Sequence, residues 1–312
     1  MAIKQPARGL IPAIFVMIGA FAFIYVGEKI FLMDIGLIAV YALFFVWVAF
    51  VVSLCDKWPC HRMKQPVVGS IFLLVSLVLG IMHPVVMGWL GYDAGWYWPL
   101  ISNLFLGVGL VVAFSNGLVA GFKQPKSVFT NALFMYVFAI VGLLWFGFVP
   151  AIWFAMFVFV FFWMETWPFG ATKQPAKGIM MFVMMGFFAL LLEYGFEMFH
   201  TTFFNPDAGL WFVLFVWWLV LTSWQLETWP LKGVKQPLKA IGGLVITVPL
   251  TFISYYIIVN VLGIATGAGG MYVWVFVSWL YTWDIVFGKW PAERAAKQIA
   301  PESAGKEAAT SK

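Results

Sequence analysis

Apolar and polar segments alternate along nearly the whole chain. A helix needs about 20 apolar residues to cross a bilayer, and it satisfies its own backbone hydrogen bonds there. The apolar segments approach this length and are joined by short polar turns. The alternation therefore predicts about ten transmembrane helices, over Leu10–Val26, Ile35–Leu54, Val67–Leu90, Trp98–Leu118, Val128–Phe148, Ala151–Met164, Gly178–Phe199, Leu210–Leu226, Ala240–Leu262 and Met271–Phe287. We expect His83-Pro84 to kink the third helix and a glycine-rich turn, Gly267–Gly270, to precede the tenth.

A short motif recurs between these segments. The triplet Lys-Gln-Pro begins at Lys4, Lys64, Lys123, Lys173 and Lys235, and a Trp-Pro pair precedes three of these triplets. The spacing predicts an all-α bundle of five parallel two-helix repeats, since each repeat crosses the membrane twice. We expect one membrane domain over residues 1–291, with repeats at approximately 4–63, 64–122, 123–172, 173–234 and 235–291, and a disordered cytoplasmic tail over 292–312.

The prolines and tryptophans of these junctions have a structural interpretation. Proline fits the first turn of a helix, so Lys-Gln-Pro predicts a helix start. The residue before proline avoids the helical region, so Trp-Pro predicts a helix end. Tryptophan and lysine favour the headgroup layer of a membrane. Each junction is therefore expected to lie at a membrane surface.

The amino-acid composition excludes a water-soluble fold. Of the residues, 63% are hydrophobic and 10% are charged, whereas soluble domains carry about 25% charged residues. The net charge of +5 does not indicate nucleic acid, since the cations lie at the junctions and the opposite loops hold one lysine, Lys29. This asymmetry places both termini in the cytoplasm. We expect the protein to lie in the lipid bilayer of a bacterial inner membrane. A homo-oligomer and a complex with other membrane proteins are both compatible with the sequence. Cys55 and Cys60 are interpreted as free thiols.

Carboxylates near the inner face form the first candidate site. Asp56, Glu165 and Glu227 each lie three residues before a junction proline. An acid at a helix C-terminus has the unfavourable sign for the helix dipole, so a partner is expected. One hypothesis is a set of ion pairs with lysines of adjacent junctions, such as Lys173 and Lys235. The other is a cation pathway.

A second candidate site faces the other side. Glu193, Glu197 and His200 follow one another at helical spacing and share one face of the seventh helix. The Glu-x-x-His spacing occurs in carboxylate-bridged metal sites of helix bundles, so a metal cofactor is one interpretation. A second is cation binding, and a third is simple contact with water in the headgroup layer. Possible companions are Glu28, Asp34, His83, Asp93 and Asp207.

The leading functional hypothesis is a transporter or channel for a small solute or cation. Parallel hairpins around an axis leave a central pathway, and carboxylates at Asp56, Glu165, Glu227, Glu193 and Glu197 would bind cations at its two mouths. A membrane-embedded enzyme or enzyme subunit with the outer Glu/His site is the first alternative. A non-catalytic anchor for partner proteins is the second. No glycine-rich phosphate loop or nucleophile elbow is visible, and no known family is recognised.

Overall fold

The residues that the structure describes form ten α-helices, as the alternation of apolar and polar segments predicts. The computed structural model describes residues 4–54, 60, 63–92, 94–113, 126–146, 151–202 and 207–288. No strand occurs in this part of the chain. The helices are α1 (Ala7–Lys29), α2 (Ile35–Leu54), α3 (Val67–Trp89), α4 (Tyr97–Ala113), α5 (Lys126–Phe146), α6 (Ala151–Val158), α7 (Ala176–Thr202), α8 (Ala208–Val220), α9 (Leu238–Tyr256) and α10 (Thr266–Phe287).

Short non-α turns extend several of these helices. A 3₁₀ turn, η1 (Ala94–Trp96), precedes α4. Three π-helical turns follow α6, α8 and α9, namely η3 (Phe159–Trp163), η4 (Leu221–Gln225) and η5 (Ile257–Val261). Single π turns inside or at the end of an α-helix occur frequently at functional sites. Two of them, η3 and η4, end two residues before the glutamates of the Glu-Thr-Trp-Pro segments.

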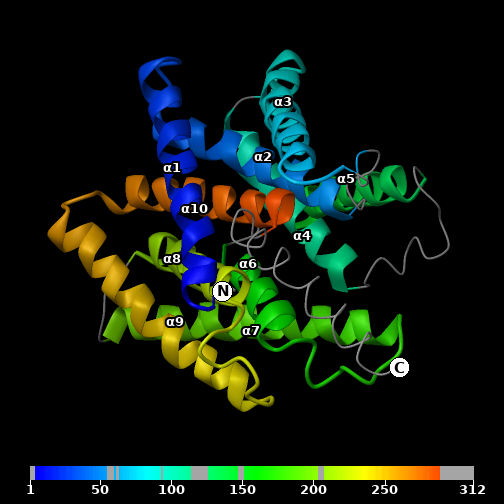
Figure 1. Ribbon diagram of the computed structural model, residues 1–312, viewed down its shortest axis with the longest axis vertical. Coiled ribbons are helices and arrows are strands. Elements are labelled where there is room, and N and C mark those ends of the chain that lie inside the picture. Colours follow the sequence, from blue (N-terminus) through cyan, green and yellow to red (C-terminus); the bar gives the residue numbers. More distant parts are fainter. Residues whose placement is uncertain are drawn as a thin grey trace, which may run out of the picture.

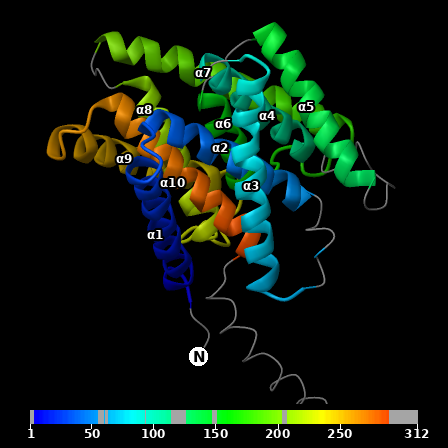
Figure 2. The same cartoon turned by 90° about the horizontal axis from the view of Figure 1, so that it is seen from above.

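The helices form an inner ring and an outer layer. The even-numbered helices pack side by side in a closed cycle, from α2 through α4, α6 and α8 to α10 and back to α2. The odd-numbered helices lie outside this ring (Figure 1). Figure 2 shows α5 and α7 on the opposite side of the inner helices from α1. The chain therefore alternates between the inner ring and the outer layer at every turn.

Burial follows this division. Each long helical segment contains an 18-residue stretch that is its most apolar part. In the segment formed by α8 and η4, 72% of this stretch is buried, and in α10 the share is 61%. The corresponding shares are 22% in α3 and 17% in the segment formed by α9 and η5. Large apolar side chains such as Leu144 and Val245 remain exposed on the outer helices. The outer layer thus presents an apolar surface of the kind that lipid covers.

Six helical segments of the described chain are long and apolar enough to cross a bilayer: Ala7–Lys29, Val67–Trp89, Ala176–Gly195, Ala208–Gln225, Leu238–Val261 and Thr266–Phe287. They indicate a multi-pass membrane protein. The other four helices are apolar over shorter stretches of the described residues. Residues 292–312, expected to be a tail, lie outside the described residues.

One local expectation needs correction. The glycines at 267–270 belong to the first turns of α10 instead of a separate turn. A Cβ on Gly269 would lie 3.0 Å from Ile258 and 3.5 Å from Leu210, so glycine there permits close packing of α10 against its neighbours. The turn itself lies earlier, where Gly263 adopts a φ of 64°. Helix α3 includes Pro84 within its bounds, and the kink expected there stays a prediction.

Candidate functional site

The junction carboxylates Glu165 and Glu227 both form ion pairs that join separate parts of the chain. The Nζ of Lys239 in α9 lies 2.5 Å from Oε1 of Glu165. The Nη1 of Arg8 in α1 lies 3.6 Å from Oε1 of Glu227, and Nζ of Lys232 lies 2.7 Å from its Oε2. Asp56 lies outside the described residues.

One hypothesis was that these acids pair with cations of the junctions, and Glu165 and Glu227 both form such pairs. The pairs use Lys239, Arg8 and Lys232 in place of Lys173 and Lys235. The reason is helical geometry. Lys239 and Arg8 lie within the first turn of α9 and α1, where a helix that docks by its start brings its first cation onto the acid.

The backbone of both acids is unusual. Glu165 and Thr166 have φ angles of 50° and 66°, and Glu227 and Thr228 have 51° and 59°. Left-handed conformations are rare for non-glycine residues, above all for β-branched threonine, and cost about 1–2 kcal/mol per residue. The surrounding packing must offset this cost at both places. A repeated strained segment next to a π turn is a site where function is commonly found.

The outer candidate site is described only in part. Glu193 lies in α7 and is partly buried. Glu197 and His200 also lie in α7, but their side chains are outside the described set. No cluster of three or more potential metal ligands occurs among the side chains that the structure describes.

Several proposed companions of that site make contacts of their own. Asp34 accepts a hydrogen bond from Leu37 N at 2.9 Å, and Asp207 accepts one from Leu210 N at 2.8 Å. These are helix N-cap bonds, at the starts of α2 and α8. Glu28 accepts a hydrogen bond from the hydroxyl of Tyr272 at 3.0 Å. Asp93 lies outside the described residues.

His83 is engaged in a link between outer helices. Its Nδ1 lies 2.6 Å from the carbonyl oxygen of Leu79. Because a carbonyl only accepts, Nδ1 carries the proton, and a neutral ring accepts at Nε2. The Nε2 is hydrogen-bonded to the hydroxyl of Tyr136 in α5. The ring also stacks on Phe44, at 5.1 Å between centroids. His83 thus ties α3 to α5 across α2.

Aromatic side chains from all five inner helices, counting η4 as the extension of α8, meet inside the ring. The ring centroid of Tyr281 lies 4.4 Å from that of Trp224, 5.2 Å from that of Phe50 and 5.5 Å from that of Phe154. Phe105 lies 5.0 Å from Phe154 and 6.1 Å from Phe50. We call these five residues the aromatic plug. They fill the space that the sequence suggested as a central pathway.

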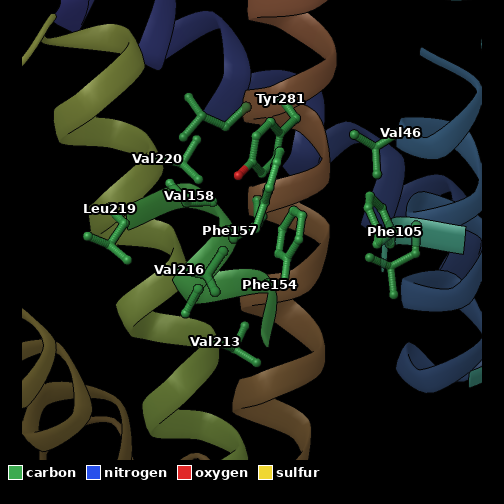
Figure 3. Packing of buried hydrophobic residues seen from close by; sticks show 14 of the residues in the cluster. Val46, Phe105, Phe154, Phe157, Val158, Val213, Val216, Leu219, Val220 and Tyr281 are labelled. Atoms are coloured by element: carbon green, nitrogen blue, oxygen red, sulfur yellow. The ribbon is translucent and has the colours of Figure 1, made fainter. Parts of the chain in front are cut away.

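Unpaired polar atoms accompany the aromatic plug. The hydroxyls of Ser278, Tyr281 and Thr282 in α10 are fully buried and have no hydrogen-bond partner among the described residues. The Tyr281 hydroxyl points toward Val158 of α6 and Val220 of α8 (Figure 3). Similar atoms occur elsewhere among the described side chains, such as Oγ of Ser76 and Nε1 of Trp279, and each calls for an explanation such as water, an ion or a second conformation.

A buried amide extends this polar group toward the ion pairs. Gln225, at the end of η4, is fully buried, and its Nε2 donates to Oδ1 of Asp284 at 3.3 Å. Its Oε1 has no partner in the described part of the structure. The site-residue predictions did not include this group. The available signal was Ser278, Tyr281 and Thr282 at one-turn spacing within an apolar helix.

Comparison of the chain with protein-family models, with curated proteins and with solved structures gave no match.

Proposed function

We propose that this chain is a membrane transport protein that carries a small cation or a proton through its inner helix ring. The observation that supports this function is the set of buried, unpaired hydroxyls beside the aromatic plug. An unsatisfied buried hydroxyl costs about 1–3 kcal/mol. A purely structural core would lose nothing with phenylalanine at Tyr281, so the hydroxyl is explained by a partner met in another state, such as water or the transported ion.

The carboxylates take a supporting role in this proposal. Asp56, Glu165 and Glu227 at the inner end, and Glu193 and Glu197 at the outer end, would raise the local cation concentration at the two mouths. From the lysines of the junctions, we also propose that both termini face the cytoplasm of a bacterial inner membrane. The aromatic plug corresponds to a closed state of the pathway.

A matched pair of tyrosine variants tests the proposal. Tyr281→Phe removes the unpaired hydroxyl, whereas Tyr255→Phe removes a hydroxyl that accepts a hydrogen bond from Asp207 N at 2.8 Å. Each protein is reconstituted in liposomes, and flux of H⁺, Na⁺ and K⁺ is followed with internal dyes. We expect Tyr281→Phe to lower flux about tenfold, the equivalent of one lost hydrogen bond, while leaving stability unchanged or higher. Tyr255→Phe should lower stability and leave flux unchanged.

Two outcomes would overturn the proposal. The first is wild-type liposomes that show no flux of any of the three cations above empty liposomes. The second is equal flux in wild type and Tyr281→Phe.

A membrane anchor for partner proteins is the second candidate, favoured by the ion pairs that engage Glu165 and Glu227. Absent flux together with a co-purifying membrane subunit would support that alternative.

A further inference from the structure

One pair of hydrogen bonds occurs at every described Lys-Gln-Pro glutamine. The side-chain Oε1 accepts from a backbone N–H in the first turn of its own helix: Gly9 for Gln5, Gly69 for Gln65 and Gly178 for Gln174 (all 3.1 Å), and Ala240 for Gln236 (3.3 Å). The Nε2 donates to a carbonyl far along the chain: Gln5 to Gln225 (3.1 Å), Gln65 to Val286 (2.8 Å), Gln174 to Ala113 (3.0 Å) and Gln236 to Trp163 (2.6 Å). Each glutamine therefore caps one helix and docks it on another.

The docking position follows a fixed register in the sequence. The acceptors Trp163, Gln225 and Val286 each lie five residues before the proline of a Trp-Pro pair, at Pro168, Pro230 and Pro291. At these three contacts, the equivalent carbonyl near the end of an inner helix therefore accepts a hydrogen bond from the equivalent glutamine at the start of an outer helix.

A second contact accompanies the first where charge allows it. The cation three residues after the glutamine pairs with the acid three residues before the proline: Arg8 with Glu227, and Lys239 with Glu165. Where Gln65 docks on α10, both positions are uncharged, with Val68 in place of the cation and Gly288 in place of the acid. Where Gln174 docks on Ala113, the cation position holds Lys177 but the acid position holds Ser115. The ion pair therefore adds to the glutamine contact at two of the four described positions and is not a requirement for it.

The order of docking has one constant step. Counting hairpins as α1–α2 through α9–α10, the fourth glutamine docks on the second hairpin and the fifth on the third. The first docks on the fourth, and the second docks on the fifth. Each of these outer helices thus docks on the hairpin that lies two places before its own when the five hairpins are counted in a circle. The same rule holds for the first two hairpins, whose partners are the fourth and the fifth.

We propose that this recurrent surface closes five repeated hairpins into a ring with approximate fivefold symmetry, in which the N-terminal hairpin fills the gap beside the last two. The partner of each Lys-Gln-Pro surface is another segment of the same chain. The N-terminal hairpin is then an integral sector of the ring, equal to the others, instead of an appended one.

Glutamine-to-glutamate substitution tests this inference in the full-length protein in mild detergent. Glutamate keeps an oxygen for the cap but loses the Nε2 donor, so it breaks the contact between hairpins and adds one negative charge. Ring closure predicts that Gln5→Glu and Gln236→Glu lower the midpoint of one cooperative thermal transition by similar amounts, about 2–8 °C. The matched control is Ala7→Glu, which places the same charge at an exposed position of the same helix start, where a carboxylate suits the helix dipole. Its midpoint should stay within about 1 °C of wild type, or rise.

A contrary result is equally clear. If the N-terminal hairpin is an appendage, Gln5→Glu produces a separate early transition and leaves the main midpoint unchanged. A second measurement applies if the glutamine variants do not fold. A protease site is inserted in the exposed turn at residues 30–33 of the otherwise unchanged protein, which is then cut there. Co-elution of α1 with the remainder supports the ring, and release of α1 from the intact remainder overturns it.

Discussion

The Nζ of Lys239 lies 2.5 Å from Oε1 of Glu165, and the two side chains differ in their contact with solvent. The lysine side chain is 7% exposed and the glutamate side chain is 56% exposed. The pair therefore consists of a buried cation that depends on a partly solvated anion. Removal of Glu165 leaves a buried cation, whereas removal of Lys239 leaves a partly solvated anion. The two substitutions should therefore lower the stability of the protein by different amounts.

Removal of the carboxylate should be more harmful than removal of the amine. Glu165→Gln leaves a buried ammonium group without its counter-ion, at a cost of about 1–2 kcal/mol, which we set below the value for fully buried pairs because Glu165 is solvated. Lys239→Met leaves an exposed carboxylate and should cost less than about 1 kcal/mol. The double variant should be more stable than Glu165→Gln alone. Denaturant unfolding in detergent gives the cycle, and a larger loss in Lys239→Met would contradict this account.

Close backbone approach at Gly9 makes a second prediction. A Cβ on Gly9 would lie 2.3 Å from the carbonyl oxygen of Gln225. Backbone atoms cannot move aside as a flexible side chain can, so Gly9→Ala should destabilise by about 1–3 kcal/mol. The control is Gly267→Ala, because a Cβ on this helical glycine would meet nothing within 4 Å. Thermal unfolding should show Gly267→Ala neutral or stabilised, by up to about 1 kcal/mol.

The N-cap at Asp207 separates a structural role from a cation-binding role. Asp207→Ala should cost about 1 kcal/mol, since Leu210 N loses its acceptor. Asp207→Ser removes the charge but keeps an oxygen for the cap, so its stability should stay close to wild type. The cation dependence of flux in liposomes should be unchanged in the serine variant. A change there would assign Asp207 to the pathway.

The sequence predicted the helices well because their determinants are local. The second predicted segment, Ile35–Leu54, has the same bounds as α2. Proline at a helix start and apolar length act over a few residues, so both can be recognised without the fold. The glycines of α10 were assigned to a turn because their role, close contact with residues such as Leu210, depends on a neighbouring helix.

The partners of the candidate residues could not be predicted in the same way. Lys239 meets Glu165 from 74 residues away, and no local rule prefers it over Lys173 or Lys235. Tyr281 differs, because its polar stripe with Ser278 and Thr282 is visible in the sequence. What the sequence lacked was the direction of that stripe, which points into the ring only once α10 has been placed between α2 and α8.

The contact between Gln5 and Gln225 also constrains how the protein is made. The two residues are 220 positions apart, and a ribosome adds about 5–20 residues per second. The first helix therefore enters the membrane roughly 10–40 s before its acceptor carbonyl exists. Until then, the side chains of Gln5 and Arg8 must interact with other groups, such as water, lipid headgroups or an insertion factor. Assembly ends only when the final hairpin arrives, because Gln65 at the start of α3 docks on the carbonyl of Val286 in α10. A chain truncated before α10 would therefore leave α3 without its acceptor.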